Sequence, residues 1–151
     1  DWKTPFNLLE IGKGIKINDG KDIAILSIGH PGNFVTKAIQ ILNENGVFPA
    51  HYDMRFAKPL DEELLHEIAQ NYPKMITVED GTVVGGFGSA VLEFLNEHHY
   101  HNEVTILGIP DRIVEHGKPE ELHRECGYDA KAIIETVRQL SAMEVRVKEL
   151  V

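Results

Sequence analysis

The stretch Met75-Ile76-Thr77-Val78-Glu79-Asp80-Gly81-Thr82-Val83-Val84-Gly85-Gly86-Phe87-Gly88-Ser89-Ala90-Val91 decides the fold of this chain. It begins as a short apolar run with β-branched residues, which predicts a buried strand. It leaves that strand through two carboxylates, crosses a glycine-rich loop and continues with apolar residues at helical spacing. A strand, a glycine-rich turn and a helix form half of a βαβ unit, in which sites gather at the carboxyl ends of the strands.

The glycines of this turn have three interpretations. Gly85, Gly86 and Gly88 could cradle a phosphate at the helix start, where free amides carry partial positive charge. Glu79 or Asp80 could instead fold back and cap those amides, or the glycines could let the helix pack tightly against another subunit. The string matches neither GxGxxG nor GxxxxGK[ST], so the sequence favours the internal cap with close packing.

The composition indicates which classes of protein this chain can belong to. The 151 residues, 42% hydrophobic and 26% charged, suit one globular domain with a proper core. A net charge of −9 argues against nucleic acid or an anionic membrane as a partner. No apolar run is long enough to span a bilayer, and the lone Cys126 suits a reducing cytoplasm. Because the chain begins at Asp1 in a segment typical of linkers, we expect a piece of a longer protein.

Farther out from the deciding stretch, apolar runs alternate with amphipathic ones. Strands are expected at 8–11, 23–28, 47–52, 75–78 and 104–109, with helices between and after the last four. Asp61 is the expected N-cap of one helix, and the segment 141–151 fits either a helix or a strand. This alternation predicts an α/β domain with a mainly parallel sheet covered on both faces, in which Ile25, Val78 and Ile106 lie on central strands.

The other candidate groups favour structural roles. His98, His99 and His101 lack a cysteine or carboxylate to complete a zinc site, so a solvated helix end is expected. Adjacent residues at a strand end point opposite ways, which argues against a proton shared by Glu79 and Asp80.

Arg55, His116 and Cys126 each have a functional and a structural interpretation. Arg55 follows a strand and could bind phosphate, but pairing with a carboxylate such as Glu79 is the expected role. His116 either faces a partner subunit or makes a local hydrogen bond in its loop. Cys126 has no visible activating base, which favours a structural thiol.

Three separated motifs carry a resemblance to a known family. They are Asp53-Met54-Arg55-Phe56-Ala57-Lys58-Pro59-Leu60-Asp61, then Thr77 to Gly81 with Gly85 to Val91, then Leu107 to Arg112 with Glu115-His116-Gly117. In this order they resemble the C-terminal domain of the 1-deoxy-D-xylulose-5-phosphate synthases, in the transketolase family. The resemblance covers roughly residues 1 to 140. It divides the chain into an interdomain linker and edge strand (1–22), an α/β domain (23–140) and a tail (141–151).

The resemblance implies a fold and a parent reaction. The family fold is a three-layer α/β/α domain with a five-stranded mixed, mainly parallel sheet and one antiparallel edge strand, for which 8–11 is the candidate. The parent enzyme is a bacterial, thiamine-diphosphate- and magnesium-dependent transferase. It condenses pyruvate with glyceraldehyde 3-phosphate, releases carbon dioxide, and supplies isoprenoid (terpenoid) and thiamine synthesis. The family's cofactor, metal and catalytic motifs lie in preceding domains, and none can be carried onto a residue here.

We therefore expect a non-catalytic C-terminal domain, inactive alone, with no bound cofactor or metal, that helps a cytoplasmic homodimer to fold and assemble with the preceding domains of the same chain. The alternative is a regulatory nucleotide- or phosphate-binding domain, or a protein-docking domain, of another transketolase-family enzyme. The candidate interface or anion-site residues are Arg55, Glu79, Asp80, Gly85, Gly86, Phe87, Gly88 and His116.

Overall fold

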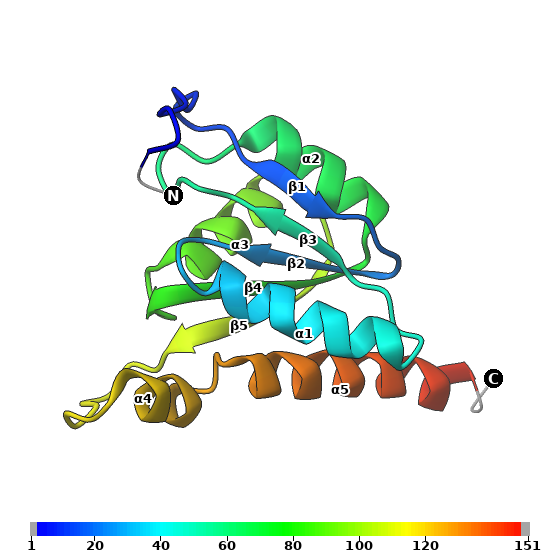
Figure 1. The fold of residues 1–151 in the computed structure, drawn as a ribbon. Coiled ribbons are helices and arrows are strands. Elements are labelled where there is room, and N and C mark those ends of the chain that lie inside the picture. The colour runs from blue at the N-terminus through cyan, green and yellow to red at the C-terminus, as the bar shows by residue number, and fades with distance from the viewer. Residues whose placement is uncertain (1–2, 149–151) are drawn as a thin grey trace.

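The computed structural model describes residues 3–148, in which strands and helices alternate along most of the chain (Figure 1). The strands are β1 (Ile15–Asn18), β2 (Ile23–Ser27), β3 (Ala50–Asp53), β4 (Lys74–Thr82) and β5 (Glu103–Ile109). The helices are α1 (Gly32–Glu44), α2 (Glu62–Asn71), α3 (Phe87–Glu97), α4 (Pro119–Cys126) and α5 (Ala130–Lys148).

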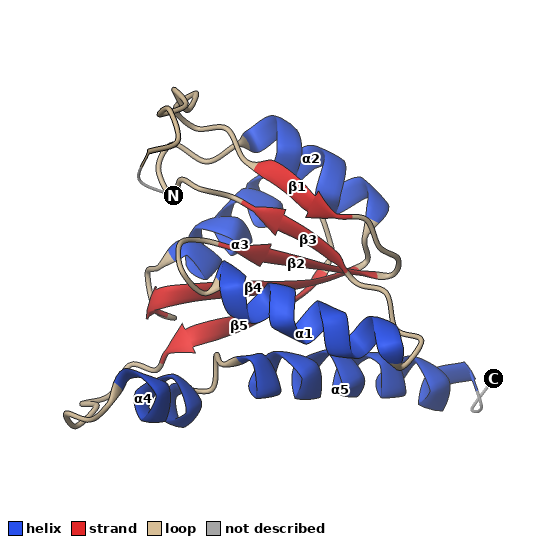
Figure 2. Ribbon diagram, in the orientation of Figure 1, coloured by secondary structure: helices blue, strands red, loops and turns tan. Residues whose placement is uncertain are grey.

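The five strands form one mixed sheet in the order β1-β3-β2-β4-β5. The neighbours from β3 to β5 run parallel, and β1 pairs antiparallel with β3. Helices α1 and α5 pack on one face of the sheet, and α2 and α3 pack on the other (Figure 2). The predicted three-layer α/β/α architecture with one antiparallel edge strand is therefore confirmed.

Each face of the sheet has its own hydrophobic core, because alternate residues of a strand point to opposite sides. On one side Ala24 and Leu26 of β2 meet Leu65 of α2 and Val91 of α3. On the other side the core joins β2 and β4 to α1 and α5 through Ile25, Ile76, Val35, Ile133 and Val137. Strand β2 is buried along its whole length, as its continuous apolar run predicts.

The antiparallel edge strand is not the segment that the sequence indicated. Residues 8–11 form no strand, and the side chains of Leu8 and Ile11 are exposed. The strand begins only at Ile15, because Gly12 turns the chain with a φ of +74° and the amide of Gly14 is held by the Asp61 carboxylate at 3.0 Å. Gly12 and Gly14 therefore lie directly before the edge strand.

The predicted place of the last strand was also wrong. Ile25 and Val78 are fully buried on central strands, as expected, but Ile106 is only half-buried. Strand β5 pairs with β4 alone and forms the far edge of the sheet. An apolar run cannot distinguish a central strand from an edge strand that helices cover on both faces.

The order of the strands places a topological switch point between β2 and β4. From β2 the chain moves to β3 on one side of the sheet and then to β4 on the other. The loops that leave β2 and β4 therefore diverge toward opposite faces, and crevices at such points are the usual ligand sites of open α/β sheets.

The helix ends follow from local sequence. Asp61 caps α2 as predicted, because its carboxylate accepts the amide of Leu64 at 3.2 Å. Gly127 ends α4 in the left-handed conformation. Helix α5 continues into the segment 141–151 as far as Lys148, and residues 149–151 lie outside the described part of the chain, as do 1 and 2. Among the described residues, no helix combines the length and apolarity needed to cross a bilayer.

Candidate functional site

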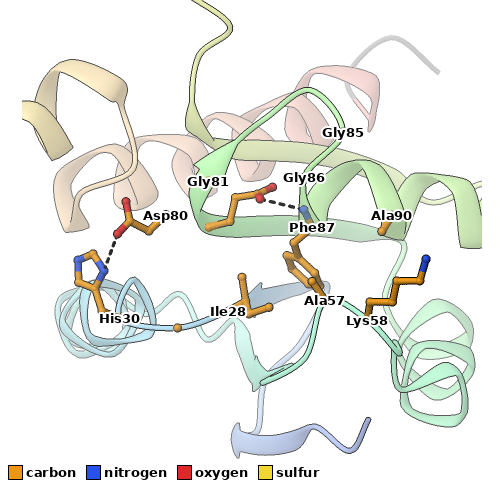
Figure 3. Close-up of a pocket in the computed structure, with 12 residues that line it drawn as sticks. Ile28, His30, Ala57, Lys58, Asp80, Gly81, Gly85, Gly86, Phe87 and Ala90 are labelled. Carbon is orange, nitrogen blue, oxygen red and sulfur yellow. Dashed lines mark hydrogen bonds and ion pairs between the residues drawn. The ribbon is translucent and has the colours of Figure 1, made fainter. Parts of the chain in front are cut away.

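A cleft of about 690 Å³ lies at the switch point, at the carboxyl ends of β2 and β4 (Figure 3). Three loops line it, and they follow β2, β3 and β4. Its apolar lining includes Ile28, Ala57, Phe87 and Ala90. The polar side chains around it are His30, Lys58, Glu79 and Asp80. Its size and mixed lining are those of a small-molecule or peptide-segment site.

Glu79 caps the amino end of α3. Its side chain is buried, and its two carboxylate oxygens accept the amides of Phe87 and Gly88, each at 2.8 Å. These are the first two amides of the helix, which otherwise lack partners, and the carboxylate also meets the positive end of the helix dipole. The predicted internal cap is thereby confirmed, with Glu79 rather than Asp80 as the capping residue.

The glycines of the turn are required by contacts inside this domain. A Cβ on Gly86 would collide with the carbonyl oxygen of Thr82 and with the Glu79 carboxylate. A Cβ on Gly88 would lie 2.6 Å from the Cγ2 atom of Ile106. Contacts with β4 and β5 of the same chain therefore account for both glycines, and the packing of a neighbouring domain or subunit against them stays a prediction.

Gly85 differs from the other two glycines of the turn. It has a φ of +75° and no atom within 4 Å of an added Cβ, so its backbone conformation alone selects glycine. Its amide is accepted by the hydroxyl of Ser89 at 2.9 Å, and that hydroxyl in turn donates to the carbonyl of Val83. The Ser89 hydroxyl thus holds the loop from Val83 to Gly85 against the first turn of α3.

Asp80 points away from Glu79, as expected, and joins three elements. The hydroxyl of Tyr128, which precedes α5, donates to its Oδ1 atom at 2.7 Å. The Nδ1 atom of His30, in the loop after β2, lies 3.2 Å from its Oδ2 atom. Burial and the hydrogen bond to Asp80 raise the pKa of Tyr128 well above its usual range. Phe34 and His123 pack against the same rings, with His30 and His123 centroids 5.1 Å apart.

Arg55 does not pair with Glu79, so that prediction was wrong. Its backbone has a φ of +58°, and its Nε atom lies 4.0 Å from the Oδ2 atom of Asp53. The same Asp53 accepts the Arg55 amide at 3.1 Å, which fixes a tight turn directly after β3. The cation that reaches the cleft is Lys58, whose side chain is exposed at the opposite end from Asp80 (Figure 3).

The remaining histidines lie away from the cleft. His116 lies on the exposed loop 110–118, outside the cleft lining. His98 is bonded to the carbonyl of Phe94, and its ring packs on His66 with centroids 4.6 Å apart. In the part of the chain that the structure describes, no three histidine, cysteine or carboxylate side chains are arranged to hold a metal ion.

A buried polar pair lies beneath the start of α1. The Ser27 hydroxyl and the Nε2 atom of His51 are 2.8 Å apart, and both side chains are almost fully buried. Burial lowers the pKa of His51 to about 4, although the nearby Asp53 acts in the opposite direction. The imidazole is therefore neutral at physiological pH, and the pair belongs to the core between α1 and the sheet.

The cleft combines residues that sequence reasoning found with others that it missed. Of the candidates, Glu79, Asp80, Gly85, Gly86 and Phe87 line it, while Arg55, Gly88 and His116 do not. His30, Lys58 and Tyr128 were missed. His30 could have been found, because it directly follows a buried strand, where switch-point loops begin. The contact of Tyr128 with Asp80 had no local signal, since 48 residues separate them.

The comparisons with known proteins agree with this fold. A family model described as "Transketolase, C-terminal domain" matches residues 12–133. The chain is 57% identical over 97% of its length to a 1-deoxy-D-xylulose-5-phosphate synthase of Cytophaga hutchinsonii, of which it covers 23%. It is 52% identical over 92% of its length to the synthase of Parabacteroides distasonis (22% of that protein) and 42% identical over 88% to that of Aquifex aeolicus (21%). The chain thus spans less than a quarter of these relatives.

Solved structures give the same picture. The chain superposes with a TM-score of 0.80 and 31% identity on a structure titled "Split gene transketolase, inactive beta4 tetramer", over 87% of this chain and 43% of that one. It superposes with a TM-score of 0.60 on the transketolase of Campylobacter jejuni, over 85% of this chain and 18% of that one. At 14% identity, the second likeness concerns the fold alone.

Proposed function

This chain belongs to the transketolase C-terminal domain family, and from that premise we propose that it is the C-terminal domain of a 1-deoxy-D-xylulose-5-phosphate synthase. The identity of 57% with the Cytophaga hutchinsonii synthase over nearly the whole chain carries the proposal. The complete protein would condense pyruvate with glyceraldehyde 3-phosphate, in the cytoplasm, with loss of carbon dioxide. Thiamine diphosphate and magnesium would be held by other domains.

The role of this domain is to support folding and assembly rather than chemistry. A diphosphate needs free amides or cations that converge on it, and the first amides of α3 are already bonded to Glu79. Two carboxylates, Glu79 and Asp80, line the same cleft, which disfavours a second anion there. The residues of the cleft therefore do not fit the diphosphate of the cofactor.

The candidate site residues fit an interface better than an anion site. The apolar lining of the cleft, together with the exposed side chain of Val84 directly before the lining residue Gly85, offers the surface that a neighbouring domain or subunit would cover. Lys58 and Asp80 at opposite ends would orient that neighbour by charge (Figure 3). Gly85 is part of the cleft lining, whereas Arg55 and His116 lie on loops outside it. Preceding domains of the same polypeptide and a second subunit are the proposed partners.

A chimeric enzyme tests the proposed function. In the Cytophaga hutchinsonii synthase, the matching C-terminal segment is replaced by this chain, and the product of pyruvate and glyceraldehyde 3-phosphate is measured with thiamine diphosphate and magnesium. We expect activity within about tenfold of the parent enzyme, which corresponds to about 1.4 kcal/mol. A synthase without the segment is the control, and it should be inactive or unstable.

Two results would count against the proposal. One is a folded chimera with no activity, which would mean that this chain does not serve that enzyme. The other is saturable binding of thiamine diphosphate to the isolated chain by calorimetry, which would mean that the cofactor is held here.

A further inference from the structure

Helix α1 ends in a hydrogen-bonded cap that contains the sequence Asn45-Gly46. Gly46 adopts a left-handed φ of +79°, and its amide donates to the carbonyl of Asn43 at 3.1 Å. The amide of Val47 donates to the carbonyl of Leu42 at 3.0 Å. These are the two bonds of a Schellman motif, for which glycine is the usual residue. The dipeptide therefore lies in an exposed turn that backbone hydrogen bonds hold closed.

An asparagine that precedes glycine is chemically labile. The backbone nitrogen of the glycine, after losing its proton, attacks the side-chain Cγ atom of the asparagine, and no glycine side chain hinders the approach. The new C–N bond closes a five-membered succinimide ring, and the side-chain nitrogen leaves as ammonia. Water then opens the ring at one of its two carbonyls and gives aspartate or isoaspartate. Asn45 is the one asparagine of the sequence that precedes glycine, and each of the others precedes a larger residue.

In the folded domain the cap holds both reacting groups. The attacking nitrogen is the Gly46 amide, which donates to Asn43, and the leaving nitrogen is the Nδ2 atom of Asn45. This Nδ2 atom donates to the carbonyl of Ile41 at 2.7 Å. The ψ of Asn45 is 11°, so ring closure needs a large rotation about its Cα–C bond. The reaction therefore proceeds from the fraction of molecules in which the end of α1 is open.

We propose that Asn45 is a site of spontaneous deamidation, at a rate set by the opening of the α1 cap, and that the modified chain cannot close this cap again. An aspartate at position 45 has no donor for the carbonyl of Ile41, and its charge lies beside Glu44 at the negative end of the helix dipole. An isoaspartate lengthens the main chain by one carbon, which displaces Gly46 from its bond to Asn43. The proposal depends on the end of α1 alone and not on the proposed function.

Mass spectrometry of aged protein tests the site and its protection. Trypsin releases residues 38–55 as one peptide, so Asn43 is an internal control for Asn45. We expect amide-to-acid conversion at Asn45, with its two isomeric products separated by chromatography. The conversion should be at least about tenfold slower in buffer than in guanidinium chloride at the same pH, because an opening that costs 1.4 kcal/mol exposes about a tenth of the molecules. Conversion of Asn43 in place of Asn45, or equal rates in the two solvents, overturns the proposal.

Matched variants test the role of the cap. Val47→Pro removes the N–H that the carbonyl of Leu42 accepts, and it leaves the Asn45-Gly46 dipeptide intact. This variant should deamidate several-fold faster than the unmodified chain, whereas Val47→Thr, which keeps the N–H, should not. A folded Val47→Pro variant that deamidates at the unmodified rate contradicts the proposal. If Val47→Pro fails to fold, the comparison of the unmodified chain in buffer and in guanidinium chloride decides.

Asn71 provides a control for the effect of the product. Its Nδ2 atom makes the same bond at the end of α2, to the carbonyl of Glu67 at 2.7 Å, but Tyr72 follows it. Asn45→Asp and Asn71→Asp should both lower the urea midpoint of unfolding, while only Asn45 should convert on ageing. Aged chains that are deamidated at Asn45 and unfold at the same urea concentration as fresh ones would contradict the loss of the cap.

Discussion

The Oε1 atom of Glu79 lies 2.8 Å from the amide nitrogen of Gly88, nine residues farther along the chain, and its Oε2 atom lies at the same distance from that of Phe87. One buried carboxylate thus joins the end of β4 to the start of α3. We expect Glu79→Ala to reduce the free energy of unfolding by about 2–4 kcal/mol, because it leaves two buried amides without an acceptor.

Denaturant melts of Glu79→Ala, Glu79→Gln and Asp80→Ala check this expectation. Glu79→Gln retains one good acceptor and should lose less than Glu79→Ala. Asp80 is about half-exposed, so its removal should cost the least of the three. Equal losses of unfolding free energy for Glu79→Ala and Asp80→Ala would show that the two hydrogen bonds of the cap do not stabilise the domain.

The close contact between α3 and β5 gives a second prediction. Gly88→Ala should destabilise the domain by about 1–3 kcal/mol, because the new methyl group would lie 2.6 Å from both Ile106 and Thr77. Gly46→Ala is the control, since its φ of +79° is strained in alanine but no atom lies within 4 Å. A Gly88→Ala variant as stable as the unmodified chain in urea melts would mean that the helix can shift outward without cost.

Central and edge strands should differ in their response to truncation. Ile76 on β4 is fully buried, and Ile76→Ala should cost about 2–5 kcal/mol. Ile106→Ala on β5 removes the same atoms from a half-buried site, so its cost should be clearly lower. Urea melts of the two variants in parallel provide the comparison. The reverse ranking would place β5, rather than β4, at the centre of the sheet.

The buried imidazole of His51 makes stability depend on pH. Its pKa is about 4 in the folded domain and 6.5 in the unfolded chain, so the unfolded chain binds more protons between these values. Stability should be complete above pH 6.5 and decline as the pH falls toward 4. The loss should reach about 3 kcal/mol, since each pKa unit corresponds to 1.36 kcal/mol.

A comparison of variants isolates this contribution from that of the carboxylates. His51→Gln should show a weaker decline in unfolding free energy between pH 7 and pH 4 than the unmodified chain, while the exposed His116→Gln should show the same decline. Identical pH profiles for His51→Gln and the unmodified chain would exclude His51 as the source.

The layers of the fold could be predicted from the sequence, but the positions within the sheet could not. The runs 23–28 and 75–78 alternate with amphipathic helices, and that alternation alone implies a sheet covered on both faces. The order of strands depends on which side of β2 each crossover takes, and no local pattern encodes that choice. For this reason the sequence predicts a central strand at Ile106, which lies on an edge strand, and an edge strand at 8–11, which begins only at Ile15.

Some contacts of the candidate site could also be predicted from the sequence, and others could not. The cap by Glu79 was predictable, because a carboxylate that directly precedes a glycine-rich turn and a helix can reach the first amides. The partner of Arg55 was not, because its left-handed backbone conformation turns the side chain toward Asp53. The contacts of Asp80 with His30 and Tyr128 join residues from three distant segments, which only the folded sheet brings together.

The two cores of the sheet become complete at different times during synthesis. All the buried residues of the core beneath α2 and α3 lie between Ala24 and Leu95, so that face can close once α3 has left the ribosome. The core beneath α1 needs Ile133, Val137 and Leu140 of α5, more than a hundred residues after β2. A nascent chain that stops before α5 thus carries a finished face and an apolar open one, and the latter is where chaperones would be needed. Stalled chains of the two lengths, compared by dye binding to exposed apolar surface, would reveal the difference.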